Sequence, residues 1–214
     1  MKDYRIVFEK RGRAKYISHL DLNRCMLRAV RRSGLPAWYT EGFHPHMYLM
    51  FPLALSLGAE STCEVMDLRL TGDVQPEEIL SRLNAALPVG LRAFEIREPK
   101  HVTRDIGSAV YEITLAGEGL ADAWEQFFAQ EQIFVEKRTK KGMKEIDIKP
   151  LVTVENAVSG ENALRLTLRL PAGNEGNINV SVVTDAFGKS ADTPFLVKEV
   201  LRTKIFCQNG ETFF

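Results

Sequence analysis

The order of sequence patterns along this chain of 214 residues limits the folds that it can adopt. Segments that alternate apolar and polar residues, which indicate half-buried strands, are interspersed with segments that have apolar residues at helical spacing. In the first half, the patterns predict the order strand, helix, strand, strand, helix, strand. The expected strands are Tyr4–Glu9, Ala37–Thr40 continued by Met47–Leu57, Glu64–Leu70 and Leu91–Ile96. The expected helices are Ser18–Gly34 and Asp73–Leu87. That order predicts a four-stranded antiparallel sheet with two helices on one face, the ferredoxin-like arrangement.

The second half repeats this order less regularly. Its expected strands and helices are, along the chain, Val110–Leu115, Leu120–Gln130, Phe134–Arg138, Ile148–Val154, Ala163–Leu170, part of Asn174–Phe187, and Val197–Cys207. We therefore predict an α+β protein made of two ferredoxin-like modules, residues 1–99 and residues 108–214. Each module is expected to have an antiparallel sheet with its helices on one face.

The composition of the chain and the placement of its apolar residues and cysteines indicate which class of protein to expect. Hydrophobic residues make up 45% of the chain, which is enough to bury a core. No apolar run approaches the roughly 18–20 residues that span a bilayer. The segment Met1–Arg5 lacks the apolar stretch of a secretory signal, so we expect a cytoplasmic protein without a membrane partner. Cys25, Cys63 and Cys207 include no closely spaced pair that would hold zinc or an iron–sulfur cluster, so no metal site and no cofactor are predicted.

Positive charge is concentrated near the beginning of a chain whose net charge is zero. Residues 1–50 hold ten lysines and arginines against four acidic residues, a local charge of +6. A basic segment on a neutral chain indicates a localised patch rather than general attraction to anions. We expect this patch to bind a polyanion, and RNA is the simplest candidate.

The segment Ser18–Gly34 has the pattern of a capped helix with two contrasting faces. Apolar residues share one face, and the opposite face holds four arginines: Arg24, Arg28, Arg31 and Arg32. Guanidinium groups bind phosphate oxygens through paired hydrogen bonds, so a nucleic-acid backbone suits this face. The alternative is that these arginines are hydrated, or paired with acidic residues elsewhere in the chain. The expected nucleic-acid contact extends over the preceding turn at Arg11, Arg13, Lys15 and Tyr16.

The segment Glu41–His46 combines an aromatic residue, glycine, proline and two histidines. Gly42 permits unusual backbone angles and Pro45 stiffens the bend, so this loop can hold its side chains in fixed positions. We expect nucleic-acid contacts from Phe43, His44 and His46. A bulged, solvated connection is the alternative. If the chain cleaves RNA, His19 and His44 are the candidate catalytic residues, because imidazole can transfer protons near neutral pH.

Several of these segments resemble a known family: Tyr16–Leu22, Arg28–Pro36, Glu41–His46, and Leu55–Ser61 leading into Glu64–Leu68. On these motifs the chain resembles the radical SAM-linked family, whose members are fused to, or encoded beside, radical S-adenosylmethionine proteins. It departs from the family pattern at Met47 and Tyr48, where members often carry a proline and a basic residue. The resemblance implies a radical SAM protein as partner and a link to RNA modification, and it implies no catalytic residues.

We therefore predict a noncatalytic accessory of a radical SAM enzyme that binds RNA or presents a substrate. A weaker similarity to RAMP-type CRISPR endoribonucleases, which also pair ferredoxin-like modules, gives one alternative, a metal-independent endoribonuclease. The stretch Asn174–Ser190 lacks the glycine-rich loop that is usual in those enzymes. A further alternative is an adaptor that binds an acidic protein and no nucleic acid.

Overall fold

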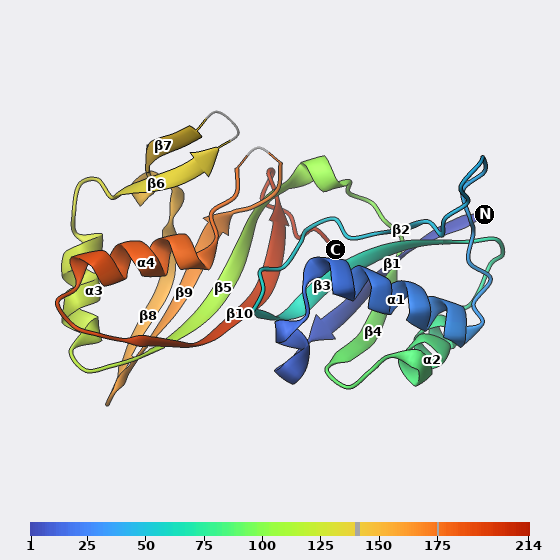
Figure 1. Cartoon of the computed structure of the whole chain (residues 1–214), viewed down its shortest axis with the longest axis horizontal. Helices are drawn as coiled ribbons and strands as arrows, with labels where there is room; N and C mark the ends of the chain where they lie inside the picture. Colours follow the sequence, from blue (N-terminus) through green and yellow to red (C-terminus); the bar gives the residue numbers. More distant parts are fainter. Residues whose placement is uncertain (140–141, 175) are drawn as a thin grey trace.

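The computed structural model describes residues 1–139, 142–174 and 176–214 as a mixed α+β fold. Figure 1 shows a twisted sheet that extends along the length of the molecule. The strands in these ranges are β1 Lys2–Lys10, β2 Leu49–Met50, β3 Glu60–Leu70, β4 Leu91–Arg97, β5 Ile106–Ala116, β6 Phe134–Thr139, β7 Gly142–Asp147, β8 Thr153–Gly160, β9 Ala163–Pro171 and β10 Leu196–Cys207. The α-helices are α1 His19–Ser33, α2 Pro76–Ala86, α3 Leu120–Phe128 and α4 Val180–Ser190.

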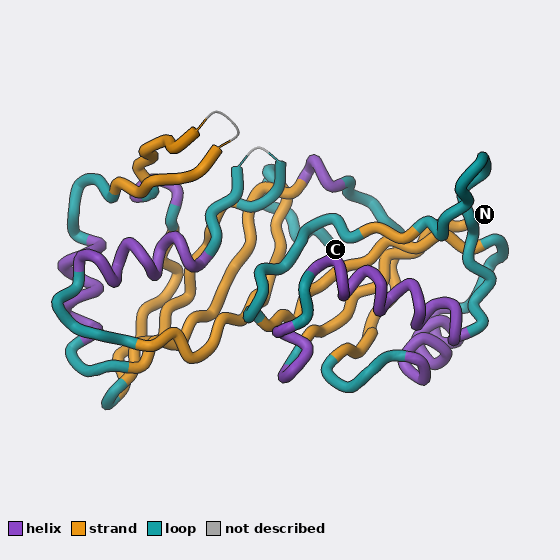
Figure 2. The backbone as a smooth tube through the Cα atoms, in the orientation of Figure 1, coloured by secondary structure: helices purple, strands orange, loops and turns teal. Residues whose placement is uncertain are grey.

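The main sheet is mostly antiparallel and continuous from one half of the chain to the other. Its strands lie in the order β4-β1-β3-β10-β5-β9-β8, and the short β2 also pairs with β3. β10 and β3 pair in parallel, with Leu201 beside Glu60 and Arg202 beside Ser61. This parallel pairing joins the two halves, and Figure 2 shows the strands following one another across the junction.

α1 has the capped, two-faced structure that the sequence predicts. Ser18 Oγ accepts a hydrogen bond from the Asp21 amide at 3.1 Å, which satisfies a donor at the start of the helix. Gly34 ends the helix with φ of 66°, a left-handed conformation that favours glycine. The buried face consists of Leu22, Met26, Ala29 and Val30. These residues pack toward the sheet, so the arginines are left on the outer side.

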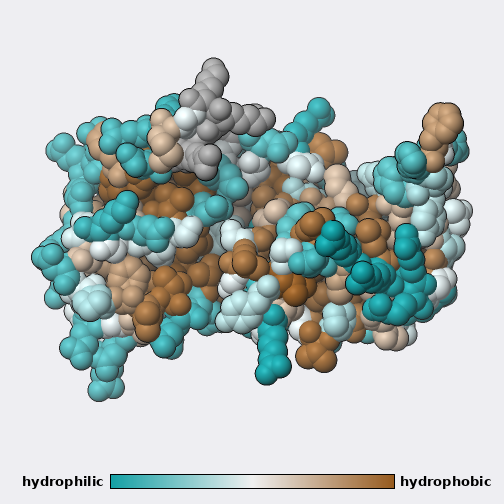
Figure 3. Space-filling model, viewed as in Figure 1, coloured by the Kyte–Doolittle hydropathy of each residue, from teal (hydrophilic) through white to brown (hydrophobic). Residues whose placement is uncertain are grey.

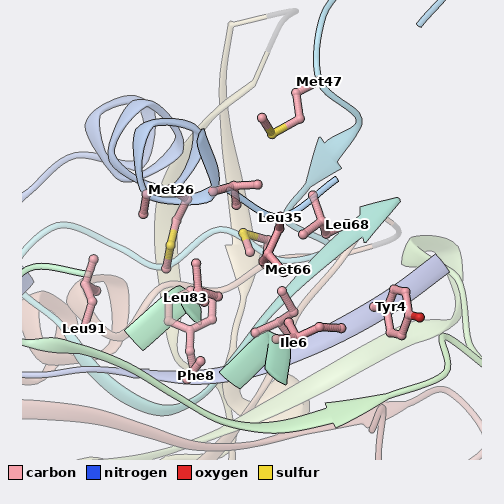
Figure 4. Close-up of a cluster of buried hydrophobic side chains, with 14 of the residues drawn as sticks. Tyr4, Ile6, Phe8, Met26, Leu35, Met47, Met66, Leu68, Leu83 and Leu91 are labelled. Atoms are coloured by element: carbon pink, nitrogen blue, oxygen red, sulfur yellow. The ribbon is translucent and has the colours of Figure 1, made fainter. Parts of the chain in front are cut away.

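Apolar cores fill the space between the sheet and the helices in each half. Figure 4 shows Met26 of α1 and Leu83 of α2 gathered with Phe8 of β1 in the first core. Alternate residues of β1 and β3 face the other way. Val7 and Val65 are buried there as members of a third apolar cluster. β1 and β3 are therefore buried on both faces, which fixes their register.

The connection between α1 and β3 contains less strand than predicted. The segment Ala37–Thr40 makes only isolated bridges, and strand pairing in the segment Met47–Leu57 is confined to β2 at Leu49–Met50 and an isolated bridge at Met47. Pro52 interrupts the second segment because proline has no amide hydrogen to donate to a neighbouring strand.

The second half differs from the predicted order at its centre. The predicted sheet strand Phe134–Arg138 lies in β6, which pairs with β7 as a hairpin outside the main sheet. The predicted strand Ile148–Val154 is largely replaced by a 3-10 turn at Lys149–Leu151, because Pro150 favours the turn over a sheet position. β8, which begins at Thr153, takes the sheet position beside β9.

Candidate nucleic-acid interface

The arginines of α1 project from the side of the helix that faces away from the sheet. All four are exposed, and Figure 3 shows strongly hydrophilic side chains gathered over α1. Among the described residues, the guanidinium groups of Arg28 and Arg31 have no hydrogen-bond or ion-pair partner. We call the set Arg24, Arg28, Arg31 and Arg32 the α1 arginine face.

The other two members of the α1 arginine face make single contacts. Arg24 Nη1 lies 3.4 Å from Asp21 Oδ1, in a pair that is exposed on both sides. Arg32 Nη2 donates to the carbonyl oxygen of Ala86, at the end of α2, at 2.7 Å. Because a guanidinium group has five N–H donors, both arginines keep donors for a ligand. The α1 arginine face is thus open to solvent along its length.

The turn before α1 contributes less open charge than its sequence predicts. Arg11 Nη1 and Lys15 Nζ both approach the carboxylate of Glu60, at 3.3 Å and 3.7 Å. Arg13 is exposed, and the Tyr16 ring is 68% exposed. Arg13 and Tyr16 therefore extend the open surface beyond α1, whereas the charges of Arg11 and Lys15 are partly offset.

The loop 41–46 presents its aromatic residue to solvent. Phe43 is fully exposed at the tip, and Gly42 has φ of 119°. His46 Nδ1 lies 3.0 Å from Thr40 Oγ1, and the His46 amide donates to the same oxygen at 3.1 Å. This contact fixes the base of the loop, while His44 is exposed and its carbonyl oxygen lies 3.3 Å from His46 Nδ1.

The structure does not bring the two candidate catalytic histidines together. His19 lies at the first turn of α1, where its ring packs against Phe51 with 5.4 Å between centroids. His44 lies in the loop that follows α1, and the chain leading into this loop pairs with Leu70, at the opposite end of β3 from Glu60, which Lys15 contacts. A helix of 15 residues is about 22 Å long at 1.5 Å per residue. Tyr16 and Phe43 are likewise separated by the length of α1, so they flank the α1 arginine face rather than forming one pocket.

Arg5, which contributes to the charge of the first quarter, is buried in an ion pair between β1 and β3. It donates to both carboxylate oxygens of Asp67, at 2.8 Å and 2.9 Å. Across the same two strands, Arg69 donates to both oxygens of Asp3, at 2.6 Å and 2.8 Å. The signal in the sequence is the spacing of two between Asp3 and Arg5, and between Asp67 and Arg69, which places each pair on one face of a strand. These opposite charges alternate across β1 and β3.

A second buried group of charges lies where the two halves meet. Arg202 Nη2 donates to Glu64 Oε1 at 2.5 Å, and both side chains are almost completely buried. Lys10 is also buried and donates to the Ile17 carbonyl at 3.2 Å. Burial lowers the pKa of Lys10, and the charge of Glu64 opposes that effect. Glu64 therefore offsets buried positive charge from both strands beside it.

We expect Cys25 to react first when the folded protein is treated briefly with iodoacetamide. Cys25 is half-buried on α1, whereas Cys63 and Cys207 are buried. Burial also raises the pKa of the Cys63 thiol to about 11, so this thiol is protonated and unreactive at neutral pH. Mass spectrometry of the digested protein measures the order of modification. Equal labelling of Cys25 and Cys63 before unfolding would contradict the expectation.

The described part of the chain shows neither a cluster of metal ligands nor a membrane-spanning helix. There, no three histidine, cysteine or acidic side chains gather as a metal site would require. None of the described helices combines the length and apolar character needed to cross a bilayer.

Comparisons with known proteins give a family and distant structural likenesses. No curated protein matches the chain. A crystal structure of an unknown protein from Galdieria sulphuraria aligns with 92% of this chain and 98% of its own, with 16% identity and a TM-score of 0.28. The family described as "Uncharacterized protein conserved in bacteria (DUF2344)" matches residues 3–180, a range that includes the whole α1 arginine face and the loop 41–46. On that match, the chain belongs to the DUF2344 family.

Proposed function

We propose that this protein binds RNA through the α1 arginine face and acts as a noncatalytic accessory of a radical SAM enzyme. The observation that carries the proposal is the pair of exposed guanidinium groups at Arg28 and Arg31, which have no partner within the described ranges. Residues three apart on a helix are neighbours, so these like charges repel in the free protein. A row of phosphates would relieve this repulsion and accept hydrogen bonds from both groups.

The residues at the two ends of α1 support a single-stranded RNA rather than a duplex. Tyr16 is 68% exposed before the helix, and Phe43 is fully exposed after it. Exposed aromatic rings beside a basic surface are typical of proteins that stack unpaired bases while arginines hold the backbone. Arg13 adds an exposed cation near Tyr16, and His44 and His46 can contribute contacts beside Phe43.

The radical SAM part of the proposal rests on the resemblance described for the motifs at Tyr16–Leu22, Arg28–Pro36 and Glu41–His46. These motifs lie within the range that the DUF2344 family match spans. In this role the protein would hold RNA for a radical SAM enzyme that modifies it, in the cytoplasm. The chemical step then belongs to the partner and not to this chain.

The order of the strands in the main sheet supports a second proposal, which concerns the fold. Residues 1–99 have the order β4-β1-β3-β2, and residues 108–214 have the equivalent order β10-β5-β9-β8. In both halves the first and third strands of the unit are central, as in a ferredoxin-like sheet. We propose two ferredoxin-like modules, with the β6–β7 hairpin as an insertion in the second.

Fluorescence anisotropy with a labelled single-stranded RNA tests RNA binding. We expect the logarithm of the affinity to fall linearly with the logarithm of the salt concentration, with a slope of about −0.7 for each phosphate contacted. An EDTA-treated sample should leave the RNA intact. Absence of binding at low salt would overturn the RNA proposal.

Co-purification tests the partner. We expect the neighbouring radical SAM protein to be recovered with this protein. A complex that survives nuclease treatment, from a protein that binds no RNA, would instead support an adaptor for an acidic partner. RNA cleavage in the presence of EDTA would support the nuclease, although the separation of His19 and His44 by the length of α1 argues against that pair as its acid and base.

A further inference from the structure

β8 lies at one end of the main sheet, and its outer edge is open. It pairs with β9 on one side, and no described strand lies on the other. Every residue of β8 except Val154 is exposed, and Val154 packs against the core of the second half. Figure 1 shows the hairpin of β8 and β9 projecting past the helices. Among the described residues, the backbone of residues 156–160 bonds only to β9, so its remaining amide and carbonyl groups are available to another strand.

The sequence of β8 lacks the features that usually keep an edge strand from pairing with another molecule. Such strands commonly carry lysine, proline or charges that point inward. β8 contains no lysine, arginine or proline. Its one charged residue is Glu155, whose Oε1 accepts a hydrogen bond from Arg169 Nε at 2.7 Å, so this charge is offset within the fold. The pairing with β9 shifts register between Val154 and Asn156, which leaves residues 156–160 as the regular part of the edge.

The strand at the other end of the sheet, β4, has the protection that β8 lacks. It carries three charged residues, Arg92, Glu95 and Arg97. Its pairing with β1 shifts register around Phe94, so the strand bulges there. Charges and a bulge both oppose pairing at an edge. Association through strand edges would therefore use β8 and would stop at two copies.

We propose that β8 pairs antiparallel with β8 of a second copy of this chain, with the two Ala157 residues opposite each other on a two-fold axis. In an antiparallel pair, residues directly opposite each other have their side chains on the same face of the sheet. Ala157 lies opposite Leu166 of β9, whose side chain is in the core of the second half. Asn156 and Val158 therefore face the other side of the sheet. With the axis at Ala157, Asn156 of each copy lies opposite Val158 of the other.

The charges and faces of the strand favour this register over its neighbours. With the axis at Ala157, Glu155 lies opposite Ser159, and the exposed Glu161 lies opposite Thr153. An axis at Val158 would place Glu155 opposite Glu161, and like charges in that position are destabilising. An axis at Asn156 would place Val154, which faces the core, opposite Val158, which faces the other side.

The association should be weak and reversible. The regular part of the edge is short, and interfaces that bury less than about 1,200 Å² are typical of transient complexes. Sedimentation velocity of nuclease-treated protein, from low micromolar to millimolar concentration, measures it without bridging RNA. We expect a shift from monomer to dimer as the concentration rises, with no larger species. A monomer at every concentration would overturn the proposal.

A charge placed on the axis tests the strand that is used. Ala157→Lys sets two lysines opposite each other and should raise the dissociation constant of the dimer by about tenfold or more. Phe94→Lys, at an exposed position on β4, is the matched control and should leave it unchanged. Position 157 is exposed, so thermal melting should show an intact fold. Equal losses in the two variants, or a folded Ala157→Lys that dimerises like the parent, would contradict pairing through β8.

A disulfide tests the register. Opposed Cα atoms in an antiparallel pair are about 4.5–5.5 Å apart, which is within the range that a disulfide spans. Ala157→Cys should therefore give a covalent dimer on mild oxidation, and a reductant should reverse it. Val158→Cys lies off the axis and should cross-link much less, and the parent protein gives the background from Cys25, Cys63 and Cys207. Cross-linking of Val158→Cys as fast as that of Ala157→Cys would overturn the register.

The dimer does not depend on the RNA proposal. The α1 arginine face lies in the first half of the chain, and β8 lies at the far end of the sheet. Arg28→Glu/Arg31→Glu should therefore leave the dissociation constant of the dimer unchanged. Loss of the dimer in this variant would contradict pairing through β8, whatever its effect on RNA binding.

Discussion

Glu64→Ala will lower the free energy of unfolding by about 3–5 kcal/mol, the usual cost of removing one partner from a buried ion pair. Arg202 is fully buried, and Glu64 is the carboxylate that it contacts. After the substitution, Arg202 would keep its hydrogen bonds to the carbonyl oxygens of Leu53 and Ala54, at 3.3 Å and 3.1 Å, and these uncharged acceptors would not replace the carboxylate. Lys10 would lose the same compensating charge. Urea unfolding followed by circular dichroism measures the change.

Two control variants separate this effect from a general loss of charge. Glu155→Ala removes the partner of Arg169 in a pair whose two side chains are 30% and 37% exposed, and such pairs contribute little. Glu64→Leu/Arg202→Met removes both buried charges and should recover most of the stability lost in Glu64→Ala. If Glu64→Ala were as stable as the parent, the pair would not be buried as described.

Arg28→Glu/Arg31→Glu should weaken binding of single-stranded RNA by on the order of 10- to 100-fold at low salt, because two phosphate contacts become repulsive. The salt dependence should become shallower as well, by about 0.7 of a unit of slope for each phosphate that the variant no longer binds. Both arginines are exposed and unpaired in the described part of the chain, so the fold should tolerate the change. Anisotropy titrations at several salt concentrations measure both effects.

The matched control for this double substitution is Arg92→Glu/Arg165→Glu, which makes the same change in net charge at exposed positions on β4 and β9. It should reduce RNA affinity much less than the change on α1. Arg28→Gln/Arg31→Gln keeps helix-forming side chains and should give an intermediate loss. If both charge reversals weaken RNA equally, binding depends on overall charge and the α1 arginine face is not the site.

The features that the sequence predicted well are those that depend on residues close together in the chain. Ser18, Gly34 and the apolar spacing between them define α1, and the structure confirms both ends and both faces. The sequence predicts a sheet strand at Phe134–Arg138, but this segment pairs with β7 in a separate hairpin, because the pattern of one strand does not specify which neighbour it pairs with. The mixed α+β class and the mostly antiparallel sheet follow from the order of elements, which depends less on each boundary.

The count of lysines and arginines in residues 1–50 predicted the exposed charge of the candidate site less well. Arg5 and Lys10 raised the apparent charge of the first quarter, but both are buried. Their partners are distant along the chain, so a local count could not identify them. Glu64 and Arg202 are separated by 138 residues, and only the β3–β10 pairing brings them together. The α1 arginine face could be predicted because helical spacing alone places its members on one side.

The parallel contact between β3 and β10 has a consequence for any attempt to study the halves as fragments. A piece that ends after β4 would uncover part of the edge of β3, and Glu64 would lose its buried ion pair with Arg202. Uncovered strand edges are templates for pairing between molecules. Expressed alone, such a piece is expected to aggregate, and in the intact protein the two parts should melt in a single cooperative transition.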